Sequence, residues 1–137
     1  MVCSKIVSTP LRLLVVDDDP SVLLTYKLIF ELQGYEVVAV FGAREAMPVL
    51  EKNRFDLLIC DLSLETSEGG LEIIASARRR DPGVPAILLT GFATPELAAE
   101  AECRNIEVIY KPIEIRELLE HMEARITRST LATRVAG

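Results

Sequence analysis

Acidic, hydroxyl and amino side chains follow four apolar stretches of this 137-residue sequence. The carboxylates come first, as the triplet Asp17-Asp18-Asp19 after one stretch and as Asp61 after another. Thr90 and Lys111 each follow a later stretch. Adjacent carboxylates repel one another and need a compensating cation, and Mg²⁺ binds proteins through a few carboxylates together with waters and phosphate oxygens. The pattern therefore favours a magnesium site that handles a phosphoryl group.

Each of these side chains has a role to play in such chemistry. Asp61 is the candidate nucleophile, since carboxylates form acyl phosphates. Lys111 can bind the phosphoryl oxygens as a cation, and Thr90 can bind them as a hydroxyl donor. Taken singly, each also has an ordinary structural explanation as a turn, strand-end or loop residue. For Asp19 we favour the structural role, as the N-cap of a helix. The combination of the others is what indicates a site.

Five apolar runs, separated by polar segments with helical spacing, must position these side chains. The runs cover residues 11–16, 36–40, 56–60, 84–89 and 106–110, and helices are expected over 20–33, 43–53, 70–80, from Thr94 onward, and 114–126. Near-continuous runs of Val, Ile and Leu are typical of strands buried on both faces of a parallel sheet. The alternation predicts an α/β fold, a doubly wound five-stranded parallel sheet of order 2-1-3-4-5 with helices on both faces.

This topology predicts where a ligand binds. In doubly wound sheets, ligands lie beyond the carboxyl ends of the strands at the switch point, here between the first and third strands. Asp17 and Asp61 follow those two strands. We expect one domain over residues 11–126, with an N-terminal extension over 1–10 and a frayed tail over 127–137.

Composition excludes several other classes of protein. With 21 acidic and 15 basic residues and a net charge of −6, the chain lacks a broad nucleic-acid-binding face. The basic run Arg78-Arg79-Arg80 is expected to be a solvated last helical turn, and His121 a surface residue of the last helix. No stretch is long enough to span a membrane. Three scattered cysteines fit free thiols in the cytoplasm.

Over residues 11–126 the sequence resembles the receiver domain of two-component response regulators. The matching stretches are Leu13-Leu14-Val15-Val16-Asp17-Asp18-Asp19-Pro20, Asp56-Leu57-Leu58-Ile59-Cys60-Asp61, Ile87-Leu88-Leu89-Thr90-Gly91 and Lys111-Pro112. The resemblance implies that Asp61 is the phosphoacceptor and that Mg²⁺ is the cofactor. It also implies that Asp17 and Asp18 bind the metal, one directly and one through water, and that the backbone carbonyl of Ser63 is a further ligand.

The resemblance further implies a switch and its partners. Thr90 is the implied switch hydroxyl, Lys111 is its cationic partner, and the Lys111-Pro112 bond is implied to be cis. The phosphoryl donor would be a phosphohistidine of a sensor histidine kinase or of a histidine phosphotransfer protein. Phosphorylation would shift the domain between two conformations and change the surface of residues 94–126 for protein partners. No output domain follows residue 126 in this sequence, so we expect either a receiver that acts through protein contacts or one that belongs to a longer chain, and we favour the first.

Several positions depart from the family's usual pattern. Glu65 stands where a proline is usual, and the loop before residue 70 is one residue longer. Val108, the usual readout position, replaces an aromatic residue, and we expect the nearby Tyr110 on the opposite face of its strand. Phe92 stands where polar residues often orient the hydrolytic water, and neither it nor the small Ser63 helps that water, so we expect slow autodephosphorylation. Beyond phosphotransfer to itself and this slow loss, we expect no enzymatic activity.

Two alternatives stay open. The chain could be a degenerate receiver fold that only mediates protein contacts, although all five core residues are present. It could also be a phosphatase resembling the haloacid dehalogenases, which share an Asp nucleophile, a Lys and Mg²⁺. That family needs a further acidic motif at a strand end after its lysine. Here the acids after Lys111 fall within a predicted helix.

Overall fold

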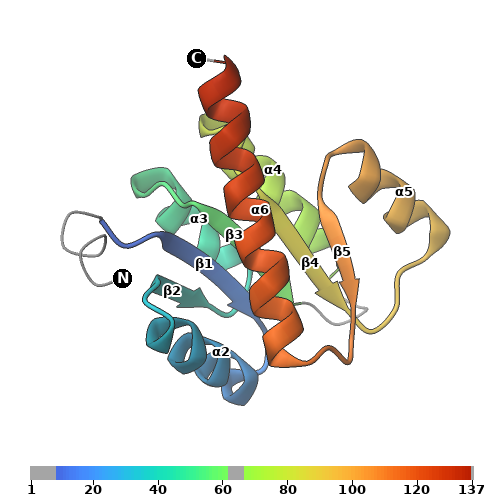
Figure 1. Cartoon of the computed structure of the whole chain (residues 1–137). Helices are drawn as coiled ribbons and strands as arrows, with labels where there is room; N and C mark the ends of the chain where they lie inside the picture. The colour runs from blue at the N-terminus through green and yellow to red at the C-terminus, as the bar shows by residue number, and fades with distance from the viewer. Residues whose placement is uncertain (1–8, 62–66, 137) are drawn as a thin grey trace.

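The structure is a computed structural model that describes residues 9–61 and 67–136. Strands and helices alternate along the described chain, and the predicted fold class is confirmed (Figure 1). The elements are β1 (Arg12–Asp17), α2 (Pro20–Leu32), β2 (Glu36–Val40), α3 (Ala43–Lys52), β3 (Leu57–Asp61), α4 (Ser67–Arg80), β4 (Ala86–Thr90), α5 (Pro95–Cys103), β5 (Glu107–Tyr110) and α6 (Ile115–Ala136). Every strand pairing is parallel, and the sheet order is β2-β1-β3-β4-β5. Within the described chain, no helix is long and apolar enough to cross a membrane.

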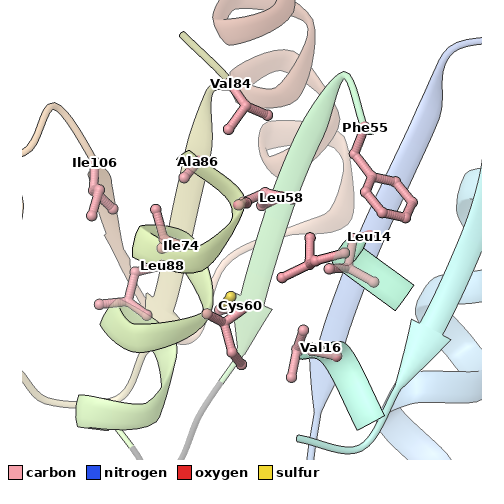
Figure 2. Packing of buried hydrophobic residues seen from close by; sticks show 14 of the residues in the cluster. Leu14, Val16, Phe55, Leu58, Cys60, Ile74, Val84, Ala86, Leu88 and Ile106 are labelled. Atoms are coloured by element: carbon pink, nitrogen blue, oxygen red, sulfur yellow. The ribbon is translucent and has the colours of Figure 1, made fainter. Parts of the chain in front are cut away.

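The side chains of the central strands alternate between two apolar cores, one on each face of the sheet. On one face Leu58 and Cys60 of β3 lie between residues of β1 and β4, as Figure 2 shows. Helices α3, α4 and α5 add Leu50, Ile74 and Ala101 to this core. The opposite face packs against α2 and α6, and its buried members are Leu13, Val15, Leu23, Phe30, Val37, Leu57, Ile59, Ile87, Leu89, Ile109, Leu118, Met122 and Ile126. Two-sided burial accounts for the near-continuous apolar runs of the sequence.

Local signals place the helix that follows the acidic triplet and the helix that follows β4. Asp19 is the N-cap of α2, and its side chain accepts a hydrogen bond from the amide of Ser21 at 2.9 Å, which confirms the structural role expected for it. Gly34 follows the end of α2 with a φ of 100°, in the left-handed region that glycine adopts without a steric cost. Thr94 caps α5 by accepting from the amide of Leu97 at 3.1 Å.

Two helix boundaries differ from those expected. Helix α4 begins at Ser67, three residues earlier than predicted, and α6 continues to Ala136, ten residues beyond the predicted end. Residues 127–136 are small and polar, which favoured a frayed tail, but they contain neither proline nor glycine to end a helix. The division into extension, domain and tail remains a prediction.

The basic run forms the last turn of α4 as expected, with Arg79 and Arg80 exposed, but Arg78 and Arg80 also bond to backbone carbonyls of other elements. The guanidinium of Arg78 donates to the carbonyl of Val84 at 2.9 Å and to that of Asn105 at 3.1 Å. Arg80 donates to the carbonyl of Leu50 at 2.9 Å. These arginines therefore link α4 to the start of β4, the loop after α5 and the end of α3.

Candidate functional site

The two carboxylates predicted to share a site lie side by side at the carboxyl edge of the sheet. Asp17 ends β1, Asp61 ends β3, and the two residues are register partners in adjacent strands. Only 3% of Asp17 and 2% of Asp61 are exposed to solvent. Thr90 ends β4 and is also buried, and Lys111 directly follows β5. The structure thus brings these predicted site residues to the same edge.

Both carboxylate oxygens of Asp61 accept hydrogen bonds. The ammonium of Lys111 donates to Oδ1 at 2.6 Å, and the hydroxyl of Tyr26 donates to Oδ2 at 2.9 Å. Sequence reasoning missed Tyr26, because its spacing from Leu23 and Phe30 is typical of an apolar helical stripe. The stripe is real, since Tyr26 packs against the core formed with α2 and α6. The signal that could have identified it is chemical. A tyrosine carries a hydroxyl beyond its apolar ring, and that hydroxyl needs a hydrogen-bond partner when the side chain is partly buried.

Asp17 is the less satisfied of the two carboxylates. Its Oδ1 accepts from the amide of Asp19 at 2.9 Å, whereas its buried Oδ2 has no hydrogen-bond partner in the described part of the chain. Burial raises the pKa of Asp17 to about 7, against the lowering effect of the Asp19 amide, and the negative charge of the neighbouring Asp61 raises it further. An unpartnered carboxylate oxygen beside a second buried carboxylate is an environment that a cation would stabilise.

The donor set fits Mg²⁺, which is commonly held by one or two carboxylates with waters and phosphate oxygens completing its octahedron. Asp17 and Asp61 supply the carboxylates. Asp18 has an exposed side chain, and its charge contributes to the raised pKa of Lys111. Within residues 9–61 and 67–136, no group of three or more acidic, histidine or cysteine side chains gathers around one point. The expected carbonyl ligand, Ser63, lies outside the described residues, as does Glu65.

Lys111 remains a cation at this site. Burial is the largest single influence on its pKa and lowers it, but the hydrogen bond and negative charge of Asp61, together with the charges of Asp17 and Asp18, outweigh that effect. The pKa of Lys111 is therefore raised above its usual value. The Lys111-Pro112 bond is cis, as the resemblance implied.

The hydroxyl of Thr90 is turned toward the loop that follows β4. It donates to the carbonyl of Phe92 at 2.7 Å and accepts from the amide of Phe92 at 3.2 Å. Both of these partners belong to the Thr90-Gly91-Phe92 turn rather than to the acidic pair. The threonine is therefore at the predicted edge, with its hydroxyl engaged away from Asp61.

Comparison with known proteins decides the family. A protein-family model described as the response regulator receiver domain matches residues 13–123. This chain belongs to that family. The receiver is 30% identical over 125 residues to the transcriptional regulatory protein GlrR of Escherichia coli (strain K12), covering 90% of this chain and 28% of that protein. It is 29% identical to the DNA-binding response regulator MtrA of Mycolicibacterium smegmatis, covering 86% of this chain and 51% of that protein.

A solved receiver structure shows the same fold. It is a receiver domain protein (CheY-like) from Methanospirillum hungatei JF-1, 31% identical to this receiver, with a TM-score of 0.82 over 90% of this chain and 99% of that chain. The curated relatives are longer proteins, since this receiver spans 28% of GlrR and 51% of MtrA. Membership of the family places the receiver in two-component phosphorelay signalling.

The side chains of β5 alternate between the two faces of the sheet. Ile109 packs into the core beneath α2 and α6, whereas Val108 packs against the core on the other face. Tyr110 is two residues from Val108, so the two side chains share a face and the opposite placement expected for Tyr110 was wrong. Tyr110 is 53% exposed. In this receiver the aromatic side chain of β5 therefore sits at the strand's carboxyl end, beyond Val108.

Proposed function

We propose that Asp61 accepts a phosphoryl group from a phosphohistidine of a sensor histidine kinase or histidine phosphotransfer protein, with Mg²⁺ as cofactor. The observation that supports this most directly is the buried Asp61 carboxylate, bonded to Lys111 at 2.6 Å and set beside Asp17 at the switch point of the sheet. A lone buried carboxylate would be costly, and a structural ion pair would need only one acid. The second buried carboxylate is what calls for a further cation.

The transfer exchanges one phosphorus bond for another. A carboxylate oxygen of Asp61 forms a bond to phosphorus while the bond from phosphorus to the donor imidazole nitrogen breaks, and the imidazole retains that electron pair and takes up a proton. Asp17 and Asp61 would hold Mg²⁺, with Asp18 and the Ser63 carbonyl as proposed further ligands, and the metal would neutralise charge on the phosphoryl oxygens. The phosphoryl group brings its own negatively charged oxygens, whereas the carboxylate of Asp61 loses its charge when it becomes an acyl phosphate. The ammonium of Lys111 can then bind a phosphoryl oxygen.

Thr90 is the proposed switch. To reach a phosphoryl oxygen on Asp61, its hydroxyl must give up both hydrogen bonds to Phe92, so the turn after β4 must rearrange. The phosphoryl group favours the conformation in which that exchange has occurred. The surface that would respond comprises α5, β5 and α6.

Contacts between β5 and α6 provide a route for such a change. Glu107 of β5 accepts from Arg125 at 2.9 Å, and its other oxygen lies 2.6 Å from Nδ1 of His121. At the carboxyl edge of the sheet three large apolar residues are exposed, namely Phe92, Tyr110 and Ile115. We propose that this surface binds a protein partner when the domain is phosphorylated.

We also propose that the aspartyl phosphate is long-lived. Phe92, two residues after Thr90, is 54% exposed and offers no polar group to orient a hydrolytic water. We expect a half-life of minutes or longer when the loss of phosphoryl group is followed by intact-protein mass spectrometry. A half-life of seconds would contradict this expectation.

The test of the proposed function is modification at Asp61. With acetyl phosphate and MgCl₂, the wild-type protein should gain the mass of one phosphoryl group, Asp61→Asn should gain none, and Asp81→Asn, altered at the opposite edge of the sheet, should match the wild type. Lys111→Ala should still be modified but should lack the amide shift changes over α5, β5 and α6. An unmodified wild type would support the degenerate receiver, and turnover of p-nitrophenyl phosphate would support the phosphatase.

A further inference from the structure

We propose that Tyr26 occupies Asp61 Oδ2 in the metal-free receiver and must release this oxygen before a divalent cation can bind there. The inference rests on the proposed function, because it concerns the metal that would serve phosphoryl transfer. Tyr26 is a positioning residue in this proposal, since it acts through the Asp61 carboxylate. Its hydroxyl donates to Oδ2 at 2.9 Å.

The position of Tyr26 allows both contact and release. Leu23 and Phe30 lie three and four residues away on the same helical face and are buried, which directs the Tyr26 ring toward the sheet. The ring stacks on Phe30, with a centroid distance of 5.5 Å and an interplanar angle of 4°. Tyr26 itself is only partly buried, at the border of the core. Rotation toward solvent therefore displaces no fully buried side chain.

Oδ2 of Asp61 is also the oxygen that best suits a cation other than the Lys111 ammonium. Oδ1 of Asp61 already accepts from the Lys111 ammonium at 2.6 Å, and a divalent cation on that oxygen would lie against a positive charge. Asp61 is also the register partner of Asp17 in the adjacent strand, and both carboxylates are buried, so their negative charges repel one another. A cation shared with the unpartnered Oδ2 of Asp17 would relieve that repulsion. These charges favour Oδ2 of Asp61, where the tyrosine hydroxyl now lies.

The Tyr26 hydroxyl and a hydrated metal ion cannot both lie at Oδ2 of Asp61, because the space there is too small. Mg²⁺ requires near-octahedral coordination and keeps several of its waters, so it brings a bulky shell to any oxygen it binds. Asp61 is 2% exposed, which leaves little room around its carboxylate for both that shell and a phenol ring. The Tyr26 proton thus stands in for the cation, partly neutralising Oδ2 while the site holds no metal.

A thermodynamic consequence follows from this competition. In Tyr26→Phe the metal-free domain loses the hydrogen bond, whereas the metal-bound domain has none to lose. The variant should therefore bind MgCl₂ more tightly, by about three- to tenfold, the range for one hydrogen bond to a carboxylate that water partly replaces. Titration with MgCl₂ followed by ¹⁵N-¹H amide shifts measures the dissociation constant without any phosphoryl donor. The retained ring keeps its stacking on Phe30.

Tyr35→Phe is the matched control. It makes the same change in a partly buried tyrosine at the start of β2, the opposite edge of the sheet, and should leave the dissociation constant unchanged. Damage to the fold would weaken magnesium binding, so tighter binding in Tyr26→Phe cannot arise from a structural defect. Unchanged or weaker binding in Tyr26→Phe overturns the proposal, because it would show that the hydroxyl and the metal coexist or cooperate.

Acetyl phosphate distinguishes this proposal from the proposed function. At subsaturating MgCl₂, Tyr26→Phe should be phosphorylated faster than the wild type, and the difference should vanish at saturating MgCl₂. If neither protein is modified at any magnesium concentration, the proposed function fails while the titration still decides the role of Tyr26. If both are modified and their magnesium affinities match, the phosphoacceptor role stands and the competition is refuted.

Discussion

Replacing Asp17 by asparagine should stabilise the metal-free fold at alkaline pH. The folded state raises the pKa of Asp17 from 3.8 to about 7, chiefly through burial, so it holds the proton more tightly than the unfolded chain does. Stability therefore falls as the pH rises from about 4 to about 7, and the full cost persists above that range. Asparagine keeps an oxygen that can accept from the Asp19 amide and carries no charge, so it avoids this cost.

The size of the effect follows from the same pKa. The difference between 3.8 and about 7 corresponds to at most about 4 kcal/mol of unfolding free energy, at about 1.4 kcal/mol per pKa unit. Because the chain relaxes and water enters around a buried charge, we expect a gain of about 2 kcal/mol at pH 8. The gain should be nearly absent at pH 4, where the aspartate is protonated in the folded state.

Urea unfolding with EDTA present, at several values of pH, measures this directly. Asp18→Asn removes the same charge from an exposed neighbouring side chain and should change the unfolding free energy by no more than about 0.5 kcal/mol. Adding MgCl₂ should stabilise the wild type and narrow its difference from Asp17→Asn, because a ligand stabilises the state that binds it. An Asp17→Asn gain that is absent at pH 8, or equal at pH 4 and pH 8, would refute the buried-charge reasoning.

Two further predictions concern the scaffold. Arg78→Ala should lower the unfolding free energy measured in urea by about 1–2 kcal/mol, because it removes donors to the carbonyls of Val84 and Asn105. The control is Arg79→Ala, which should have little effect because this side chain is exposed and bonds only to the nearby Ser76. Equal losses in the two variants would contradict the prediction. Leu58→Ala should cost about 2–5 kcal/mol by opening a cavity between β1 and β4, and Leu32→Ala, at a side chain that is 83% exposed, is its control. A small loss for Leu58→Ala would mean that the core closes around the deletion.

The fold was predictable because its signals are local and repeated. Continuous apolar runs, helix caps at Asp19 and Thr94 and a glycine at position 34 each specify their own segment, and parallel topology then brings Asp17 and Asp61 to one edge. The end of α6 was not predictable in the same way. Polar residues without proline or glycine allow either a helix or a frayed tail, and propensity alone does not choose between them.

The partners of side chains were harder to predict than their positions. Tyr26 fitted an apolar stripe, and nothing in its spacing revealed that the hydroxyl extends past the core to Asp61. Arg78 and Arg80 looked like a solvated turn, because their acceptors are backbone carbonyls that are distant in sequence and carry no sequence signature. Such contacts depend on where the chain returns in space, which only the assembled fold determines.

The charge balance at the carboxyl edge links the roles of Asp17, Tyr26 and Lys111. Two buried carboxylates face one ammonium, so the metal-free site lacks one positive charge. Two features each offset part of this missing positive charge. The raised pKa of Asp17 favours a proton on its own carboxylate, and the Tyr26 hydroxyl places a proton beside an oxygen of Asp61. A divalent cation bound between the two carboxylates would neutralise both and make these two protons unnecessary. The effects of changing Asp17 and Tyr26 on the metal-free fold should therefore be coupled, because neutralising Asp17 leaves less negative charge for the tyrosine to offset.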